Sequence, residues 1–317
     1  MNIKKYLTLT LTLILSTSLI ACDNSKNKEN NSNLNKNSIN NTNEISDNES
    51  IPTLYINDKE INLKSQILVT SDNFLLPYEE LSKILNTSFI IEKSNDNEII
   101  EITDLNNDIK QFLYTSSNFS YDSNTKDSKS YYHKDRPKIV SKKLYIPIDY
   151  LYNYDFYYNL ENNQLFLISK SETQVDNNLR YLARLNTIQN KFDNFISAVS
   201  TLPNDKLLGF NLTPEEAPNG FIGFEGLANG LTQLNDENFE EVFQDIVIPE
   251  DHKNQFNTYL IASENFYKKA LELSTSLEKD RHNKDFNKEL DNLANNIKIE
   301  MIEEYENLKT AYDNLII

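Results

Sequence analysis

The spacing of hydrophobic residues changes once along this chain, and that change sets the fold class. From residue 51 to about 170, short apolar runs alternate with polar positions and are separated by polar turns, as in β-strands. From about residue 172, apolar residues recur every three or four positions, as on one face of a helix. The sequence therefore predicts an α+β protein, with a sheet-rich domain at 51–170 and an antiparallel helical bundle domain at 172–317.

Three long helices and one short helix are predicted in the second region. The first long helix ends near Pro203, the second opens at Pro249, the third begins near residue 284, and the short one lies at 236–247. Each apolar stripe has to be covered, so the helices are expected to pack against one another. The three long stripes consist of Val175, Leu179, Leu182, Ile188, Phe192, Ile196 and Val199; of Phe256, Tyr259, Leu260, Phe266, Ala270, Leu273 and Leu277; and of Phe286, Leu290, Leu293, Ile297, Met301, Leu308, Ala311 and Leu315.

One pattern occurs twice in the sheet-rich region. A short apolar strand ends at a proline, Pro77 or Pro147, and an acidic residue, Glu79 or Asp149, follows two positions later. A helical segment, a strand, a polar turn and a last strand complete each copy. The acid favours the positive end of the helix. The two copies are "FLLPYEELSKILNTSFIIEKSNDNEIIEIT" at 74–103 and "LYIPIDYLYNYDFYYNLENNQLFLIS" at 144–169.

This repeat resembles the copper amine oxidase N-terminal-like domain, a small α+β module of extracellular proteins of Gram-positive bacteria that often contains two half-repeats. The resemblance covers residues 54–169. "LYIND" corresponds to the opening hairpin, with a turn at Asn57-Asp58, and "FIIE" and "FYYN" correspond to the family's Val-x-Trp-Asp strand. The family's arginine is replaced by Glu79 and Asp149, and its tryptophan by Ile91 and Tyr158. The resemblance implies the fold, not a function that depends on that arginine or tryptophan.

Copper is not implied by the resemblance. In copper amine oxidases the metal and the quinone-forming tyrosine lie in a separate domain, with a His-x-His pair and a Thr-x-x-Asn-Tyr motif. Here Asn153-Tyr154-Asp155 follows Tyr150, where the threonine should stand, and no His-x-His occurs. The three histidines of the chain are too scattered for a histidine-built metal site. No cofactor, metal site or catalytic residue is predicted, because hydrolase and phosphate-binding motifs are also missing.

The N-terminus predicts a lipid anchor. Residues 1–21 carry two lysines and then an apolar run, which is typical of a signal peptide. "LIAC" at 19–22 resembles the lipobox of bacterial lipoproteins, which implies cleavage before Cys22 and a diacylglycerol on its thiol. The alternatives are an ordinary secretory signal followed by a chance cysteine, or an uncleaved anchor. Residues 22–50 are rich in asparagine and predict a disordered tether. The expected location is the extracytoplasmic face of the cell membrane, through acyl chains such as palmitate.

The charge limits the partners. The chain carries a formal charge of −17, and cleavage of the signal peptide would remove Lys4 and Lys5 and leave −19. Such a surface is repelled by nucleic acid and by anionic headgroups, so nucleic acid is not expected as a partner. The richness in Asn, Lys, Ile and Tyr is typical of an AT-rich genome, such as that of a low-GC Gram-positive bacterium.

Two tyrosines are candidate contact residues. Most aromatic residues of the second copy occupy positions that the first copy fills with aliphatic residues, which predicts a core role. Tyr150 and Tyr152 are different, because they align with the polar residues Glu80 and Ser82. They are therefore expected to face outward, where they could contact a partner or ligand.

The segment 209–230 is a second candidate contact site. It holds all five glycines of the chain, which indicates a loop that needs positive φ or close backbone approach. One interpretation is a partner or ligand loop with Phe210, Phe221 and Phe224 exposed. The other is a long crossover whose phenylalanines cap the core of the bundle. A similar choice applies to His133 in the polar segment 113–139, which is either part of a ligand-contact loop or a solvated tip.

Three functions are compatible with the sequence. The first is a non-enzymatic binding or scaffold lipoprotein that contacts a cell-wall polymer or a surface protein. The second is a module that binds cell-wall glycan through tyrosines. The third is an enzyme of a type that the sequence motifs do not reveal.

Overall fold

The computed structural model describes residues 51–70, 73–85, 89–93, 99–104, 109–115, 118–122, 129–154, 156–211, 223–231, 236–281 and 285–316. These residues belong to one compact unit of the chain. The predicted signal segment, the predicted lipidation site Cys22 and the predicted tether up to residue 50 lie outside them. So does Phe221. The described residues contain both helices and sheets, which confirms the predicted α+β class.

The first sheet joins the start of the sheet-rich region to its end. β1 pairs with β13 in parallel, and the other pairs are antiparallel. Asn57 and Asp58 turn between β1 and β2 with φ of 47° and 63°, as the predicted hairpin requires. Asn162 and Asn163 make the equivalent turn between β12 and β13. The strand order is β12-β13-β1-β2, with bounds Phe156–Glu161, Gln164–Ser169, Thr53–Ile56 and Lys59–Ile61.

The second sheet pairs the two copies of the repeat with each other. β4 of the first copy runs antiparallel to β11 of the second, with Leu76 opposite Ile146. These two residues occupy equivalent positions in the copies, so the pairing has a local two-fold symmetry. The symmetry extends to the outer strands, since Leu68 pairs with Leu75 as Lys138 pairs with Tyr145. The strand order is β10-β11-β4-β3, with bounds Lys138–Val140, Lys143–Pro147, Phe74–Pro77 and Leu68–Val69.

Each copy continues from its paired strand into a helix. In the first copy this is the α-helix α2 (Tyr78–Leu85), and in the second it is the 3₁₀-helix η1 (Ile148–Tyr154). The second copy is three residues shorter between its proline and its next strand, which fits the shorter helix. Equivalent positions Leu81 and Leu151 are buried in both copies.

The third sheet is an antiparallel meander that starts in the first copy and ends just before the second. It includes a hairpin from the segment 113–139. The strand order is β5-β6-β7-β8-β9, with bounds Phe89–Lys93, Ile99–Asp104, Ile109–Tyr114, Phe119–Asp122 and Lys129–Tyr132.

The C-terminal region is helical, as predicted. Asp176 caps the first long helix by accepting hydrogen bonds from the backbone N–H groups of Asn178 and Leu179. Asn287 caps the last helix in the same way. No helix in the described ranges is both long and apolar enough to cross a membrane. The helices are α3 (Asn177–Thr201), α4 (Asn204–Leu207), α5 (Phe224–Gly230), α6 (Asp236–Phe243), η3 (Glu250–His252), α7 (Lys253–Arg281) and α8 (Lys288–Ile316).

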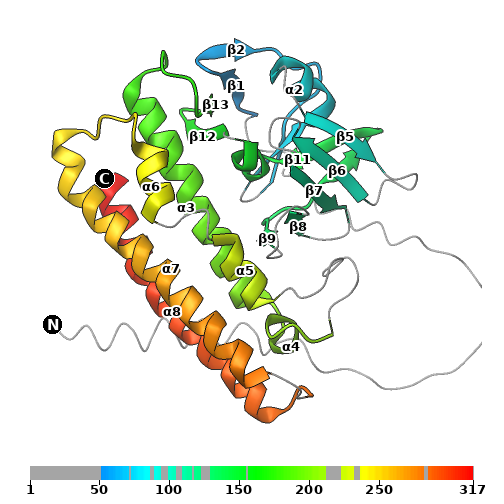
Figure 1. Ribbon diagram of the computed structural model, residues 1–317. Coiled ribbons are helices and arrows are strands. Elements are labelled where there is room, and N and C mark those ends of the chain that lie inside the picture. Colours follow the sequence, from blue (N-terminus) through cyan, green and yellow to red (C-terminus); the bar gives the residue numbers. More distant parts are fainter. Residues whose placement is uncertain are drawn as a thin grey trace, which may run out of the picture. The chain divides into compact units, whose positions relative to one another are not determined.

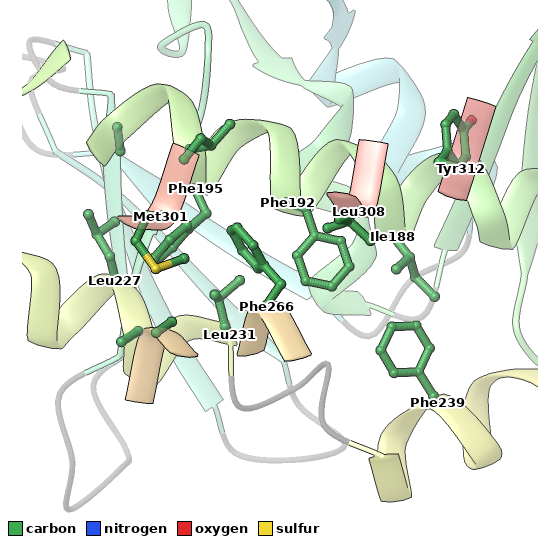
Figure 2. Packing of buried hydrophobic residues seen from close by; sticks show 14 of the residues in the cluster. Ile188, Phe192, Phe195, Leu227, Leu231, Phe239, Phe266, Met301, Leu308 and Tyr312 are labelled. Carbon is green, nitrogen blue, oxygen red and sulfur yellow. The ribbon is translucent and has the colours of Figure 1, made fainter. Parts of the chain in front are cut away.

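The long helices bury the stripes that the sequence predicts. α7 and α8 form an antiparallel pair, and α3 packs against α8 (Figure 1). The ring of Phe266 on α7 meets Phe192 and Phe195 on α3 edge to face, with centroids 5.4 and 5.5 Å apart. Figure 2 shows these rings together with Met301 and Leu308 of α8 in one cluster. Phe286 precedes α8 and is 37% exposed, so it does not belong to this buried face.

The sheets and the helices share this core across the predicted domain boundary near residue 171. Tyr157, Phe166 and Ile168 of β12 and β13 belong to the same buried cluster as the helices. On the polar side, Thr187 of α3 accepts a hydrogen bond from the backbone N–H of Tyr158 at 2.8 Å. The first long helix is therefore packed on the first sheet as well as on the bundle.

A buried arginine reinforces the same boundary. Arg184 of α3 is 2% exposed and donates to the carboxylate of Asp245 and to the backbone carbonyls of Val242 and Lys170. Arg180 also pairs with Asp245. Burial alone would raise the pKa of Asp245, but the hydrogen bonds and charges of these arginines outweigh it and hold the pKa below its ordinary value.

Candidate functional site

A buried histidine lies at the centre of the most distinctive polar cluster. His133 directly follows β9, and its Nδ1 is 2.9 Å from Oδ2 of Asp149 in η1. Its Nε2 is 2.8 Å from Oγ of Ser120 in β8. Their exposed fractions are 4% for His133, 5% for Asp149 and 1% for Ser120. A carboxylate only accepts hydrogen bonds, so Asp149 fixes the proton of His133 on Nδ1.

Two asparagines complete the surroundings of Asp149. Asn73, just before β4, donates from Nδ2 to Oδ1 at 3.3 Å, and Asn194 of α3 donates from Nδ2 to Oδ2 at 2.7 Å. Burial alone would raise the pKa of Asp149. The nearby His133 and the hydrogen bonds from His133, Asn73 and Asn194 outweigh that cost and hold the pKa below its ordinary value of 3.8. The carboxylate is therefore ionised at neutral pH.

The cluster adjoins a small cavity between β9, η1, α3 and α5. Its volume is about 40 Å³. His133, Asp149 and Asn194 form a polar end, and Phe195, Leu227 and Leu231 form an apolar wall. Figure 2 shows the three apolar residues within the buried cluster that the helices build. The complete lining is Tyr131, Tyr132, His133, Asp149, Lys191, Asn194, Phe195, Leu227, Gly230 and Leu231.

Lys191 brings a cation to this cavity. Its Nζ lies 3.5 Å from the ring centroid of Tyr152 and 5.2 Å from that of Tyr131. Both distances are within the range of a cation–π interaction. The rings of Tyr152 and Tyr131 therefore both contact the ammonium of Lys191 beside the cavity.

Asn194, in the lining of the cavity, has a buried oxygen that is unmatched among the described residues. Asn194 is 5% exposed, and its Oδ1 has no hydrogen-bond partner there. The orientation of the amide is fixed by Asp149, because the opposite orientation would place Oδ1 against a carboxylate oxygen. A buried acceptor without a donor is costly, so the hydrogen bond from Nδ2 to the ionised Asp149 has to offset this cost.

The connectivity Ser120–His133–Asp149 matches that of the triad of serine hydrolases. The histidine is held in the tautomer that a general base needs. Ser120, however, is buried in strand β8 and is not among the residues that line the cavity. The cluster thus has the proton-relay geometry, whereas its would-be nucleophile does not face the cavity.

The structure corrects the prediction for Tyr150 and sharpens that for Tyr152. Tyr150 is 0% exposed, so the expectation that it faces outward is wrong. Its helix η1 is covered by α3, and its ring lies 5.4 Å from that of His133. α3 follows the repeat in the chain, so an alignment within the repeat could not reveal this cover. Tyr152 is partly buried beneath Lys191, at the edge of the cavity.

The phenylalanines of the segment 209–230 are placed by the core. Phe224 is 0% exposed and packs against Phe195, with ring centroids 5.9 Å apart, so the interpretation that exposes it is wrong. Phe210 is partly buried and contacts Phe286 at 5.8 Å. Phe221 lies outside the described residues. The interpretation that they cap the core holds for Phe224, because α5 buries its apolar face against β9 and α7.

The glycine requirement is confirmed at Gly223. Its φ is 112°, and a Cβ at this position would lie 2.7 Å from the carbonyl oxygen of Leu207 and 2.9 Å from the backbone nitrogen of Gly209. Gly209 itself has φ of 80°. Close backbone approach therefore explains these glycines, and it fixes where α5 begins beside the cavity.

Sequence reasoning missed His133, Ser120 and Asn194 as parts of one site. The interpretation of His133 as a solvated tip is wrong, because its side chain is buried. Strand alternation could have suggested it, since Tyr131 and His133 lie two residues apart and are both buried. Asn194 interrupts an apolar stripe, which is a weaker signal. No spacing in the sequence links these residues to Asp149.

Comparison with protein-family models, curated proteins and solved structures finds no match. Within the part of the chain that the structure describes, no group of three or more His, Cys, Asp or Glu side chains is placed to hold a metal ion. The site is accordingly interpreted from its own chemistry.

Proposed function

We propose that this chain is a lipid-anchored protein of the extracytoplasmic membrane face that acts by binding a ligand or partner. The observation that carries this proposal is the small cavity between β9, η1, α3 and α5, which is lined by the polar residues His133, Asp149, Lys191 and Asn194 and by the apolar residues Phe195, Leu227 and Leu231. Such a combination of apolar walls with a few placed polar groups is what small binding sites share. The anchor rests on the lipobox-like sequence that ends at Cys22.

The sheet-rich module is part of the same proposal. Its resemblance to the copper amine oxidase N-terminal-like domain is supported by the pairing of the two copies through β4 and β11, since half-repeats of one module are expected to pack symmetrically. In this proposal the module supplies His133 and Asp149, and α3 supplies Lys191 and Asn194. The scaffold is therefore built from both regions.

The anchoring part can be tested on cells. Wild-type protein is expected in the membrane fraction and should incorporate a radiolabelled fatty acid, whereas Cys22→Ala should not incorporate it. Crosslinking on intact cells, followed by identification of the captured molecules, then tests binding at the cell surface. Equal labelling of the wild type and Cys22→Ala would contradict the anchor, and an absence of captured wall or protein partners would contradict the binding function.

Binding to cell-wall glycan is the form of this function that the cavity favours. Tyr132 and Tyr152 are partly buried beside the cavity, where an aromatic face can pack against a sugar ring. Purified walls should sediment the wild-type protein, and Tyr132→Ala should weaken this sedimentation. Tyr55→Ala is the matched control, because Tyr55 stacks on Phe166 in the first sheet and is also partly buried.

A second candidate function is acyl hydrolysis, and Ser120–His133–Asp149 is the observation that favours it. A fluorophosphonate probe reacts with activated serines and reports this activity directly. Labelling of the wild type that is lost in Ser120→Ala and in His133→Gln would establish a nucleophilic serine. An unlabelled wild type would leave the cluster with a purely structural role.

A further inference from the structure

Most edges of the three sheets are short or covered. An edge strand carries N–H and C=O groups that can pair with another chain, so folded proteins usually shorten such a strand or cover it. α3 covers β12, where Thr187 accepts a hydrogen bond from the N–H of Tyr158 at 2.8 Å and donates one to its C=O at 3.4 Å. α5 packs on β9. The edge strands β2, β3 and β10 have only two or three residues each.

The edge strand β5 differs from the others. It has five residues and begins with three apolar ones, Phe89, Ile90 and Ile91. It forms one end of the third sheet, and among the described strands it pairs with β6 alone (Figure 1). In an antiparallel sheet, alternate residues of a strand direct their N–H and C=O groups to opposite sides. Part of the β5 backbone therefore points away from β6, where a further strand would extend the sheet.

The sequence of β5 is self-complementary in one register. Two copies related by a two-fold axis pair antiparallel, and the register that uses all five residues places Ile91 opposite its own copy. Phe89 then lies opposite Lys93, and Ile90 lies opposite Glu92, so no like charges meet. The register centred on Ile90 pairs only residues 89–91. The register centred on Glu92 would place this carboxylate opposite its own copy, which is unfavourable.

We propose that β5 is a dimerisation edge, at which two copies of this chain pair antiparallel through residues 89–93. The third sheets of the two copies then join into one sheet of ten strands, five from each copy. A pair of five-residue strands is a small interface, so the dimer is weak and reversible. This inference goes beyond the proposed binding function, and it needs neither the cavity between β9, η1, α3 and α5 nor the lipid anchor.

A single introduced cysteine tests the register. Opposite residues of paired strands have Cα atoms about 4.5–5.5 Å apart, which a disulfide can span. Full-length Ile91→Cys, purified in detergent and oxidised, should therefore form a disulfide-linked dimer on a non-reducing gel. Phe89→Cys should not, because its own copy lies roughly 13 Å further along the strand. The wild type, whose only cysteine is Cys22, gives the background. Equal dimer in both variants, or none in Ile91→Cys, would overturn the proposal.

Sedimentation equilibrium tests the dimer without a covalent link. The wild type should show a monomer–dimer equilibrium in about 0.15 M NaCl, where the repulsion between two acidic chains is screened. Ile91→Lys sets two ammonium groups opposite each other and should weaken association about fivefold or more. Ile261→Lys, at an exposed position of α7, should leave it unchanged.

Folding of these variants is verified by circular dichroism, and the cysteine variants decide the question if Ile91→Lys does not fold. A wild type that stays monomeric up to about 1 mM, the concentration at which even a millimolar Kd gives dimers, would overturn the proposal. A dimer of unchanged affinity in a folded Ile91→Lys would overturn it as well.

The same cysteine identifies the occupant of the edge on intact cells. Two differently tagged copies of Ile91→Cys are produced together, and the cells are oxidised. A disulfide-linked product that carries both tags would support pairing between copies. A product that joins Ile91→Cys to a different protein, with no product that carries both tags, would overturn it and would show that β5 receives a strand of another chain.

Discussion

The two copies of the repeat use the same position for different purposes. In the first copy, Glu79 accepts a hydrogen bond from the backbone N–H of Leu144, at the start of the paired strand, at 3.2 Å. In the second copy, the equivalent Asp149 is one methylene shorter and does not make the equivalent contact. Asn73 bridges instead, since its Oδ1 accepts from the backbone N–H of Phe74 and its Nδ2 donates to Asp149.

This difference of one methylene shows how a site can arise from a structural repeat. With Asn73 taking over the strand contact, Asp149 Oδ2 is left for His133 and Asn194. In the first copy, α2 packs on β4 and β11, and its Glu80 accepts hydrogen bonds from the backbone N–H groups of Lys64 and Ser65. The two copies share the symmetric strand pairing, and the polar cluster lies where α3 covers η1 of the second copy.

The largest expected effect separates the two acids. Asp149→Ala removes the partner of a buried His133 and of two asparagines, and should lower the free energy of unfolding by about 3–5 kcal/mol. Glu79→Ala removes a partly exposed backbone contact and should cost about 1 kcal/mol. Urea unfolding followed by circular dichroism measures both. Equal losses would contradict the asymmetry of the copies.

The centre of the symmetric sheet should respond alike in both copies. Leu76 and Ile146 are both 0% exposed and face each other in the pairing. Leu76→Ala and Ile146→Ala should each lower the unfolding free energy by about 3 kcal/mol, because each leaves a cavity in a packed core. The same urea titration applies. A loss confined to one of the two would show that the symmetry is limited to the backbone.

The bridging asparagine should have an intermediate effect. Asn73→Ala leaves the N–H of Phe74 and Oδ1 of Asp149 without this partner, and should cost about 2 kcal/mol. In the double variant with Asp149→Ala, the two losses should add up to less than their sum, since both residues belong to one network. Strict additivity would contradict the bridge.

Acid should produce the smallest difference between the copies. The pKa of Asp149 and that of Glu80 are both held below their ordinary values of 3.8 and 4.5. A carboxyl group whose pKa is lower in the folded than in the unfolded protein stabilises the fold at pH values above its unfolded-state pKa. This stabilisation is lost as the pH falls through the folded-state pKa. The thermal stability should therefore decrease below about pH 4. This decrease should be smaller in Asp149→Asn than in the wild type.

Salt distinguishes the two contributions. Glu80 lies near the surface, where it pairs with Lys143 and accepts a hydrogen bond from Ser65. Its contribution to the loss of stability in acid should therefore become smaller in 0.5 M NaCl, because salt screens the charge of Lys143. Asp149 is buried and should keep its part. Thermal unfolding between pH 2.5 and 6, with and without salt, measures this. An acid response of Asp149→Asn identical to that of the wild type would rule out Asp149 as its source.

The sequence by itself determined the parts of this protein that depend on local patterns. The two periods predicted the α+β class, Asn57-Asp58 predicted a hairpin, and the stripe from Val175 to Val199 predicted a helix with its buried face. These features follow from the φ/ψ preferences of neighbouring residues and from side chains that recur on one face. The repeat was also visible, although its symmetric pairing was not.

Only the tertiary structure decided the candidate site. Ser120, His133, Asp149 and Asn194 come from a hairpin, a 3₁₀-helix and a helix of the other region, and each looks like an ordinary polar residue in its own segment. The cover of η1 by α3 reversed the expected exposure of Tyr150. A buried polar group is satisfied by partners that are distant in sequence, and packing, which no local period encodes, selects those partners.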